Sequence, residues 1–477
     1  FEHSSSKHTL VLTDHRGQVP DCPAVEKLRM STSNSYAMVE DPVVLSLQVE
    51  HAAITGCVAL TSFDYEHPTR ALLASVSGEQ PNEVYDYFGG YTEKADGDRY
   101  ARLRLEQLES EFEVVHGESN CASLTAGHKF ELFEHPSRAA NQEYHLLRVN
   151  HAASIPNYVT GGGEFDYSAS FEAIPASVMY RPPLTTSRPS VRGTQTAIVT
   201  GPSGEEIYTD KLGRVKLHFH WDRYGKSDEN SSCWVRVSSS WAGKGYGNFS
   251  VPRIGQEVIV DFLEGDPDQP IIVGRVYNAE QAPPCDPGGK GGVISGLRSK
   301  THKGSGFNEM TMDDTPGKEK ISIHAQYDMI TTVEHDDKQT VKNDRTIDVT
   351  GKHTEKIKGD TSVEVTDGNL TAKVSKGTAT ITVKKDIAMK SETTLVHIDA
   401  DTEIQLKVGA SKLLMKKSGE IELSGKNVAI KGTESVDIGG GTVTSKADTL
   451  NKIEGANVLS EGKATNTVRG GMVMLNP

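Results

Sequence analysis

The sequence predicts a mainly β protein in three parts: a β-rich N-terminal domain with some helix, a five-stranded barrel, and a long trimeric β-helix. Three observations lead to this prediction. Glycine occurs 45 times in 477 residues, which is typical of a turn-rich β protein. Five short strand-like segments follow one another within residues 194–280. A branched aliphatic residue then recurs every eight residues in the C-terminal part of the chain.

The first domain is expected to span residue 1 to about residue 190. Its apolar alternation predicts strands at residues 9–12, 132–133 and 146–149. The helical spacing of Leu105, Leu108 and Phe112 predicts an amphipathic helix over residues 98–112. Asp96 or Asp98 is the candidate N-cap of that helix, because a short acidic side chain can accept hydrogen bonds from the first free N–H groups.

The middle domain, residues 194–280, follows a proline-rich linker at residues 181–189. Strands are predicted at residues 196–200, 214–219, 233–237, 256–262 and 271–277. Five short strands in so little chain favour an oligonucleotide/oligosaccharide-binding (OB) barrel. The domain contains nine Lys plus Arg and twelve Asp plus Glu, so it lacks the basic groove of a single-strand binder. We therefore expect an adaptor with no nucleic-acid partner.

A linker and shaft entry, residues 281–330, leads into the repeat of residues 331–477. The strict spacing of eight joins Val333, Val341, Val349, Ile357 and Val365. Eight is even, so in an extended chain these side chains return to one face of the strand. One chain supplies one face at a time, and the simplest closed solution is a triangular prism wound from three chains. We expect these five residues to form the core of a homotrimeric shaft.

The composition of the shaft supports that interpretation. Residues 331–477 contain no Phe, Tyr, Trp or Cys, and proline occurs only at the last position, so neither bulky rings nor missing donors interrupt a narrow β-prism. Their 21 Lys plus Arg balance 21 Asp plus Glu, which places the formal net charge of −14 in the preceding chain. A disordered polar tail is the alternative, but it would have no reason to keep aliphatic residues in phase.

The cysteines, the apolar runs and the two ends of the sequence limit the class of protein further. The five cysteines are odd in number and scattered, as expected for folding in a reducing cytoplasm rather than for a disulfide framework or a zinc site. No apolar run is long enough to span a membrane. The first residue is Phe1 and the chain ends at Asn476-Pro477, so we expect a piece of a longer polypeptide.

Few residues suggest a catalytic or ligand-binding site. His218 and His220 alternate on one predicted strand, but without a third ligand at a telling spacing they predict no metal site. The three tryptophans of the middle domain are expected in its core or at a subunit contact rather than stacked on sugars. The His-Pro pairs at residues 67–68 and 135–136 are interpreted as strand ends. No hydrolase, metalloprotease or nucleotide-binding motif occurs, so we predict no catalytic residue, no metal and no cofactor.

The motifs of the middle domain carry a specific resemblance. They are DKLGRVK at 210–216, HFHWD at 218–222, CWVRV at 233–237, WAG at 241–243, PRIGQEV at 252–258, FLEGDPDQP at 262–270 and GRVYN at 274–278. With FEAIP at 171–175 upstream, and GFNE at 306–309 and IHAQYDM at 323–329 downstream, the chain resembles the VgrG spike proteins of bacterial type VI secretion. The first part of the family's hub region lacks a counterpart here.

The resemblance implies a mechanical part. The first domain would be a phage-tail-hub-like domain, incomplete at its N-terminus, and three copies would sit on the hexameric Hcp tube next to other baseplate components. The shaft would pierce a target envelope and carry effectors or a PAAR-repeat cap at its tip. Assembly would occur in the bacterial cytoplasm, followed by secretion into the medium or a target cell. The family's role requires no enzyme activity from these residues.

The apolar end of the chain is the candidate tip contact. Met472, Met474 and Leu475 make this end more apolar than the shaft before it, and an open β-helix end invites aggregation unless something covers it. We expect a PAAR-type cap, or chain beyond Pro477, to contact these residues. The alternative is that they only complete the trimer core.

Two other interpretations compete with the secretion spike. A hub and spike of a contractile phage tail or tailocin would follow the same physics. A polysaccharide lyase would need longer coils within one chain and aromatic or carboxylate clusters along a groove, and the octad tract has no aromatic residue. A lysozyme between barrel and shaft is too large for the residues between Tyr277 and the first strict octad.

Overall fold

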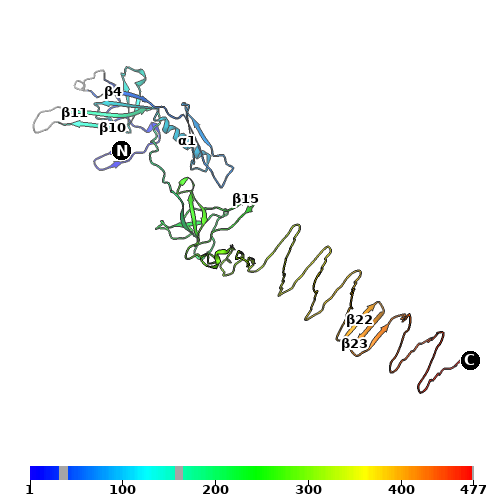
Figure 1. Ribbon diagram of the computed structural model, residues 1–477. Helices are drawn as coiled ribbons and strands as arrows, with labels where there is room; N and C mark the ends of the chain where they lie inside the picture. Colours follow the sequence, from blue (N-terminus) through cyan, green and yellow to red (C-terminus); the bar gives the residue numbers. More distant parts are fainter. Residues whose placement is uncertain (32–40, 156–164, 475–477) are drawn as a thin grey trace. The chain divides into compact units, whose positions relative to one another are not determined.

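The computed structural model describes residues 1–31, 41–155 and 165–474. It is mainly β, with one α-helix in those residues, and it divides into two compact units, residues 1–338 and 339–477 (Figure 1). The predicted fold class is confirmed in its outline: a β-rich domain with a helix, a small five-stranded domain and a C-terminal repeat follow one another along the chain.

A closed six-stranded barrel dominates the first domain. Its strand order is β10-β11-β8-β4-β3-β9. The strands are β3 (Lys27–Met30), β4 (Val43–His51), β8 (Glu113–Ser119), β9 (Lys129–Phe133), β10 (Glu143–Ser154) and β11 (Asp166–Pro175). Inward residues alternate with outward ones, and Phe130, Tyr144 and Phe171 fill the interior with edge-to-face and tilted ring contacts. The buried Tyr144 hydroxyl donates a 3.0 Å hydrogen bond to the Ala140 carbonyl.

A smaller layer accompanies the barrel. The mixed sheet β6-β5-β7 comprises β5 (Cys57–Thr61), β6 (Ala74–Ser77) and β7 (Glu83–Tyr87), and helix α1 (Lys94–Glu109) packs on β5 and β6. Tyr91 joins these elements, because its hydroxyl lies 2.8 Å from the Leu60 carbonyl and 2.6 Å from the Leu72 carbonyl. The long strands β4, β10 and β11 run away from this layer (Figure 1).

Two local predictions in this domain are wrong in detail. Helix α1 begins four residues earlier than expected, with Glu93 as N-cap and no side-chain capping bond, while Asp96 and Asp98 lie inside the helix. Phe112 lies beyond the helix and stacks on His51 with ring centroids 5.3 Å apart. The N-terminal strand is also shorter than predicted: β1 (Glu2–His3) pairs with β2 (His8–Thr9), and residues 10–12 are exposed.

The middle domain forms the predicted five-stranded sheet. Its order is β13-β12-β17-β18-β14, from β12 (Gln195–Thr200), β13 (Lys216–Phe219), β14 (Arg236–Val237), β17 (Glu257–Phe262) and β18 (Pro270–Arg275). An antiparallel bridge between Val215 and Val235, with both N–H···O bonds at 2.9–3.0 Å, joins the segments leading into the two edge strands. This closure buries a core that includes Leu217, Val258 and Ile272. A hairpin of β15 (Ala242–Gly243) and β16 (Tyr246–Gly247) projects from the domain.

The C-terminal part contains two three-stranded meanders. The first consists of β19 (Ile294–Arg298), β20 (Glu309–Asp313) and β21 (Lys320–His324), and the second of β22 (Glu403–Val408), β23 (Ser411–Lys416) and β24 (Ile421–Ser424). Short 3-10 helices complete the assignment: η1 (Arg16–Gln18), η3 (Arg138–Ala140), η4 (Leu263–Gly265) and η5 (Lys290–Val293).

Within a single chain, the residues with the spacing of eight do not form the paired strands that a β-helix requires. Residues 325–402 are all described and carry no strand, so the Ile347–Val349 and Val363–Val365 segments pair with no segment of their own chain. Residues 428–430 and 436–438, which also alternate, likewise lie in no strand, whereas residues 421–423 lie in β24. A strand needs ladder partners, and successive octads do not provide them to one another.

Candidate functional site

The octad residues form an unpartnered apolar row. Val333, Val341, Val349, Ile357 and Val365 are each between 46% and 50% exposed in the single chain, a narrow range that indicates one repeated environment. Every other side chain from residue 331 to residue 402 is exposed as well. The tract is therefore a repeated surface, since within its own chain it has no interior.

Glycine accommodates two changes in the repeat length. After Val365 the next valines are Val374 and Val383, each nine residues after the one before. Their exposed fractions, 54% and 48%, resemble those of the octad residues. Each longer step contains a glycine with positive φ, Gly368 at +124° and Gly377 at +112°. Glycine adopts this conformation without the steric cost of a Cβ, so one extra residue is absorbed at a corner and the apolar row stays in phase.

The tip residues are open to solvent where the structure describes them. Met472 and Met474 are 79% and 82% exposed, and Val473 between them is 47% exposed. Leu475 lies outside the described residues. The contact of this end with a cap stays a prediction.

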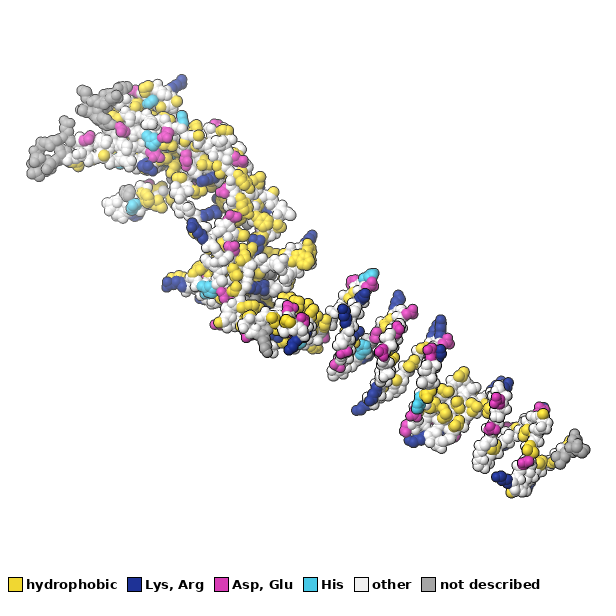
Figure 2. Space-filling model, viewed as in Figure 1, with side chains coloured by type: hydrophobic (Ala, Val, Ile, Leu, Met, Phe, Trp, Pro, Cys, Tyr) yellow, Lys and Arg dark blue, Asp and Glu magenta, His cyan; other side chains and the backbone are white. Residues whose placement is uncertain are grey.

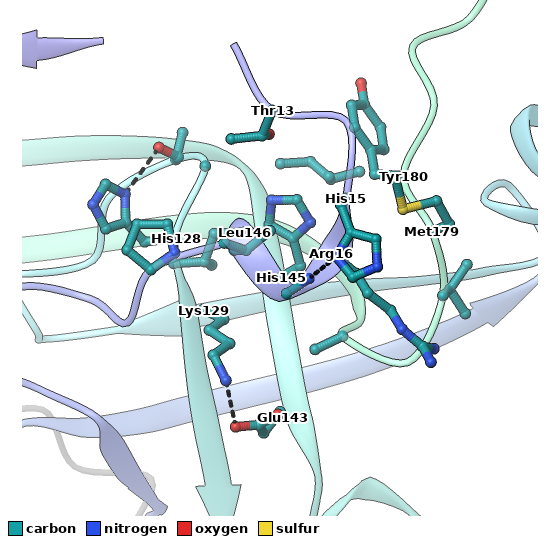
Figure 3. A pocket seen from close by; sticks show the side chains of 18 of the residues that line it. Thr13, His15, Arg16, His128, Lys129, Glu143, His145, Leu146, Met179 and Tyr180 are labelled. Carbon is teal, nitrogen blue, oxygen red and sulfur yellow. Dashed lines mark hydrogen bonds and ion pairs between the residues drawn. The ribbon is translucent and has the colours of Figure 1, made fainter. Parts of the chain in front are cut away.

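A cavity of about 760 Å³ opens beside the hub barrel (Figure 3). Three histidines from separate segments line it, His15, His128 and His145, together with Tyr180. Burial, with a smaller contribution from the nearby His128, lowers the pKa of His145, and its ring meets that of Tyr180 edge-to-face at 6.0 Å. This grouping could not be predicted, because no fixed spacing in the sequence relates the three histidines.

Two basic side chains at this cavity have protein partners. Lys129 forms a 2.8 Å ion pair with Glu143, drawn in Figure 3, and Arg16 donates a 2.7 Å hydrogen bond to the Ser177 carbonyl. Within residues 1–31, 41–155 and 165–474, no group of three His, Cys, Asp or Glu side chains is placed to hold a metal ion.

The histidines that the sequence analysis singled out at residues 67, 218 and 220 have local hydrogen-bond partners. His218 Nε2 lies 3.0 Å from the Asp222 carbonyl, and His220 Nε2 lies 3.0 Å from Thr196 Oγ1. His67 pairs with Asp64 at 2.8 Å. The carboxylate of Asp64 accepts this bond and one from the Glu66 backbone N–H, and both lower the pKa of Asp64.

The tryptophans are less buried than a core role requires. Trp221 and Trp241 are 67% and 65% exposed, so the core alternative is wrong for both. Trp234 is partly buried, with the Lys216 ammonium 4.8 Å above its ring. Trp241 meets Tyr246 edge-to-face at 5.8 Å on the projecting hairpin. Their role at a subunit contact stays a prediction.

A charged junction joins the first domain to the OB domain. The Arg214 guanidinium donates 2.6 Å hydrogen bonds to Asp210, to Glu66 and to the Tyr65 hydroxyl. Burial alone would lower the pKa of Arg214, but these three bonds outweigh it and the pKa is raised. Arg236 lies 4.3 Å from the centroid of the Tyr65 ring, so two arginines from the OB domain hold one tyrosine of the hub.

Three protein families match successive segments of the chain. The phage tail baseplate hub (GPD) family matches residues 1–157, the type VI secretion system/phage-baseplate injector OB domain matches residues 197–277, and the bacteriophage T4 gp5 C-terminal trimerisation domain matches residues 295–409. These segments cover the barrel domain up to β10, the five-stranded domain, and the first meander with the following chain up to β22.

Curated relatives narrow this assignment. The type VI secretion system spike protein VgrG1b of Pseudomonas aeruginosa is 40% identical over 366 residues, which cover 72% of this chain and 48% of that protein. The chain is a homologue of the VgrG spike proteins. The actin cross-linking toxin VgrG1 of Vibrio cholerae is 36% identical over 386 residues, covering 79% of this chain and 35% of that protein. The chain thus spans about half the length of the first VgrG relative and about a third of the second.

Among solved structures, an E. coli component of the type VI secretion system, described as similar to T4 bacteriophage tail proteins gp27 and gp5, matches with a TM-score of 0.30. The two are 20% identical, over 52% of this chain and 49% of that chain. The resemblance to VgrG that the sequence motifs predicted is confirmed by the family matches and by the curated VgrG relatives. No helix in the described residues is long and apolar enough to cross a membrane.

Proposed function

We propose that this chain is the hub, adaptor and shaft of a puncturing spike of the type VI secretion machine. The observation that carries the proposal is the order of the three matched segments: baseplate hub, injector OB domain and trimerisation domain. The VgrG names of the relatives favour a secretion spike over a contractile phage tail or tailocin, which is the second candidate.

The spike is a homotrimer in this proposal. The octad row leaves about half of each aliphatic side chain exposed and leaves the backbone of residues 325–402 without strand partners in its own chain. Three chains winding around one axis bury that row and supply the missing ladders between chains. Val333, Val341, Val349, Ile357 and Val365 then line the axis.

In this proposal the hub domain and the C-terminal end of the shaft bind different partners. The hub domain would bind the end of a hexameric Hcp tube and neighbouring baseplate components, with the residues 1–157 match as support. The exposed Met472 and Met474 would contact a PAAR-type cap or an effector, because flexible thioether side chains adapt to an apolar partner. Assembly would precede secretion, so the trimer would form in the cytoplasm and leave through the machine.

We assign a mechanical role, without catalysis, to residues 1–477. The relatives named as spike proteins support this role, and the shaft is a repeat of aliphatic and charged side chains. One relative is named an actin cross-linking toxin, and this chain covers only 35% of it. A toxin activity in such a relative can therefore belong to residues that have no counterpart in this alignment.

Release of Hcp tests the proposal. A strain lacking its own copy of the gene should stop releasing Hcp into the medium, and the reintroduced gene should restore release. A variant with Ile357→Asp should not restore it, whereas Lys358→Asp, on the other face of the extended chain, should. Full Hcp release without the gene, with no second spike gene present, would contradict the proposal.

A further inference from the structure

The second meander carries an apolar face that the octad pattern does not explain. Strands β22, β23 and β24 are antiparallel neighbours, and their register aligns two cross-strand rows on one face. These rows are Ile404, Met415 and Ile421, followed by Leu406, Leu413 and Leu423. Side chains directly opposite in an antiparallel sheet stand about 5 Å apart, so the six form one continuous surface.

This face is open in the single chain. Leu406, Ile421 and Leu423 are 56%, 70% and 52% exposed. The other three residues of the two rows are half-buried. Leu414, the apolar residue of the opposite face, is by contrast 3% exposed. Figure 2 shows hydrophobic side chains gathered over this meander, while Lys, Arg, Asp and Glu side chains are spread along the shaft on either side. The exposed apolar side chains of this meander therefore lie on one of its two faces.

The opposite face of the meander carries mainly charged side chains. Lys412 pairs with Glu422 at 3.5 Å across β23 and β24, and Lys416 pairs with Glu420 at 2.9 Å. These partly exposed ion pairs add little stability, but full burial of their charges would be costly. The meander thus has one side that water should cover and one that protein should cover.

The first meander repeats this design. Its exposed apolar rows are Leu297, Met310 and Ile323, followed by Met312 and Ile321, all between 40% and 79% exposed. Its other face carries the Arg298–Glu309 ion pair at 3.2 Å. Almost all of this meander lies within residues 295–409, the segment that matches a trimerisation domain, and the match ends inside β22.

We propose that the β22–β24 meander forms a trimer contact in addition to the octad row. Its apolar face packs against the same face of two further copies of this chain. The proposal rests on the trimer proposed above. In a trimer of identical chains in register, the three meanders lie at one level, and turning their apolar faces to the axis buries all three while the ion pairs stay in water.

The two meanders also give the shaft a unique register. Successive octads present equivalent aliphatic residues, so a chain displaced by eight residues still finds matching neighbours along most of the tract. A meander has no equivalent eight residues away. With one meander before residue 325 and the other after residue 402, a displaced chain leaves at least one apolar face uncovered, which disfavours the displaced assembly.

Cross-linking of one introduced cysteine at a time tests whether the apolar faces of the meanders pack together. Leu413→Cys and Glu422→Cys are placed in adjacent strands on opposite faces of the meander, in a full chain whose more accessible Cys57, Cys233 and Cys285 are replaced by Ser. Each protein is treated with a short bismaleimide and analysed on a denaturing gel. Leu413→Cys should give at least about tenfold more covalently joined chains than Glu422→Cys, because side chains on opposite faces point apart.

Val349→Cys in the same background separates this inference from the proposed trimer. If Val349→Cys joins chains efficiently but Leu413→Cys does so no better than Glu422→Cys, the trimer stands and another partner covers the meander, which overturns the inference. If Val349→Cys joins no chains and the protein is monomeric, the trimer itself is refuted. If either meander variant fails to fold, Leu406→Cys against Gln405→Cys repeats the comparison on β22, where adjacent residues again lie on opposite faces.

Discussion

Replacing Ile357 with Asp should prevent assembly of the shaft. Ile357 is 49% exposed in the single chain, so about half of its side chain is still available for burial between chains. Full burial of such a side chain stabilises by about 1.5–3 kcal/mol, which makes the lost burial about 1 kcal/mol per chain and about 3 kcal/mol per trimer. The substitution occurs three times in one layer of the prism.

The introduced charge costs more than the lost burial. An unpaired carboxylate in a low-dielectric interior costs several kcal/mol, and three of them in one layer also repel one another, so the total reaches on the order of 10 kcal/mol per trimer. This is comparable to the whole folding stability of a typical domain. Lys358→Asp changes the charge of each chain by twice as much, yet on the solvent face it should cost less than about 0.5 kcal/mol.

Light scattering after size exclusion, together with thermal unfolding followed by circular dichroism, measures both effects. The Ile357→Asp protein should lose the trimer peak, or unfold far below the unsubstituted protein, while Lys358→Asp should match the unsubstituted protein. Lowering the pH towards 4 should lessen the defect, because protonation removes the buried charge. Equal trimer content and equal melting temperatures for both variants would refute a core position for Ile357.

Three further predictions concern other parts of the chain. Arg214→Ala should lower OB-domain stability by about 2–3 kcal/mol in thermal unfolding, because it leaves the largely buried Asp210 carboxylate without its cation; an unchanged melting temperature would contradict this. Because burial lowers the pKa of His145 in the fold, the unfolded chain binds more protons below about pH 6.5, so hub stability should fall as the pH drops from 7 to 5.5; His145→Gln should flatten that slope, and an equal slope would exclude the residue. Met474→Glu should leave the trimer mass unchanged while weakening cap binding in a pull-down, and full binding would refute the tip contact.

The OB domain could be predicted closely because its strands are short, alternate cleanly and are separated by turn residues. All five predicted segments contain the observed strands apart from one residue at the start of β12 and one at the start of β18. Helix α1 is predicted but misplaced, since the actual N-cap Glu93 accepts no hydrogen bond that a capping rule would detect. The exposure of Trp221 and Trp241 could not be predicted, because an aromatic residue at a future interface resembles one in a core.

The C-terminal part shows a different limit. The octads identify which residues share a face, but strand pairing depends on other chains, so a single chain shows exposed segments where the sequence predicts strands. The β22–β24 meander is not distinguished from the octads, because its residues alternate as they do. A signal for it exists in Gly409 and Gly419, which have positive φ and lie in the turns that join its three strands. The histidines around the hub cavity have no such signal.

The mass of the particle in solution tests the central claim most directly. Three chains of 51.7 kDa make a particle of about 155 kDa (3 × 51.7). Light scattering coupled to size exclusion at micromolar concentration should return that mass for the folded protein. A folded particle of 51.7 kDa, with its strand content intact by circular dichroism, would contradict the trimeric spike.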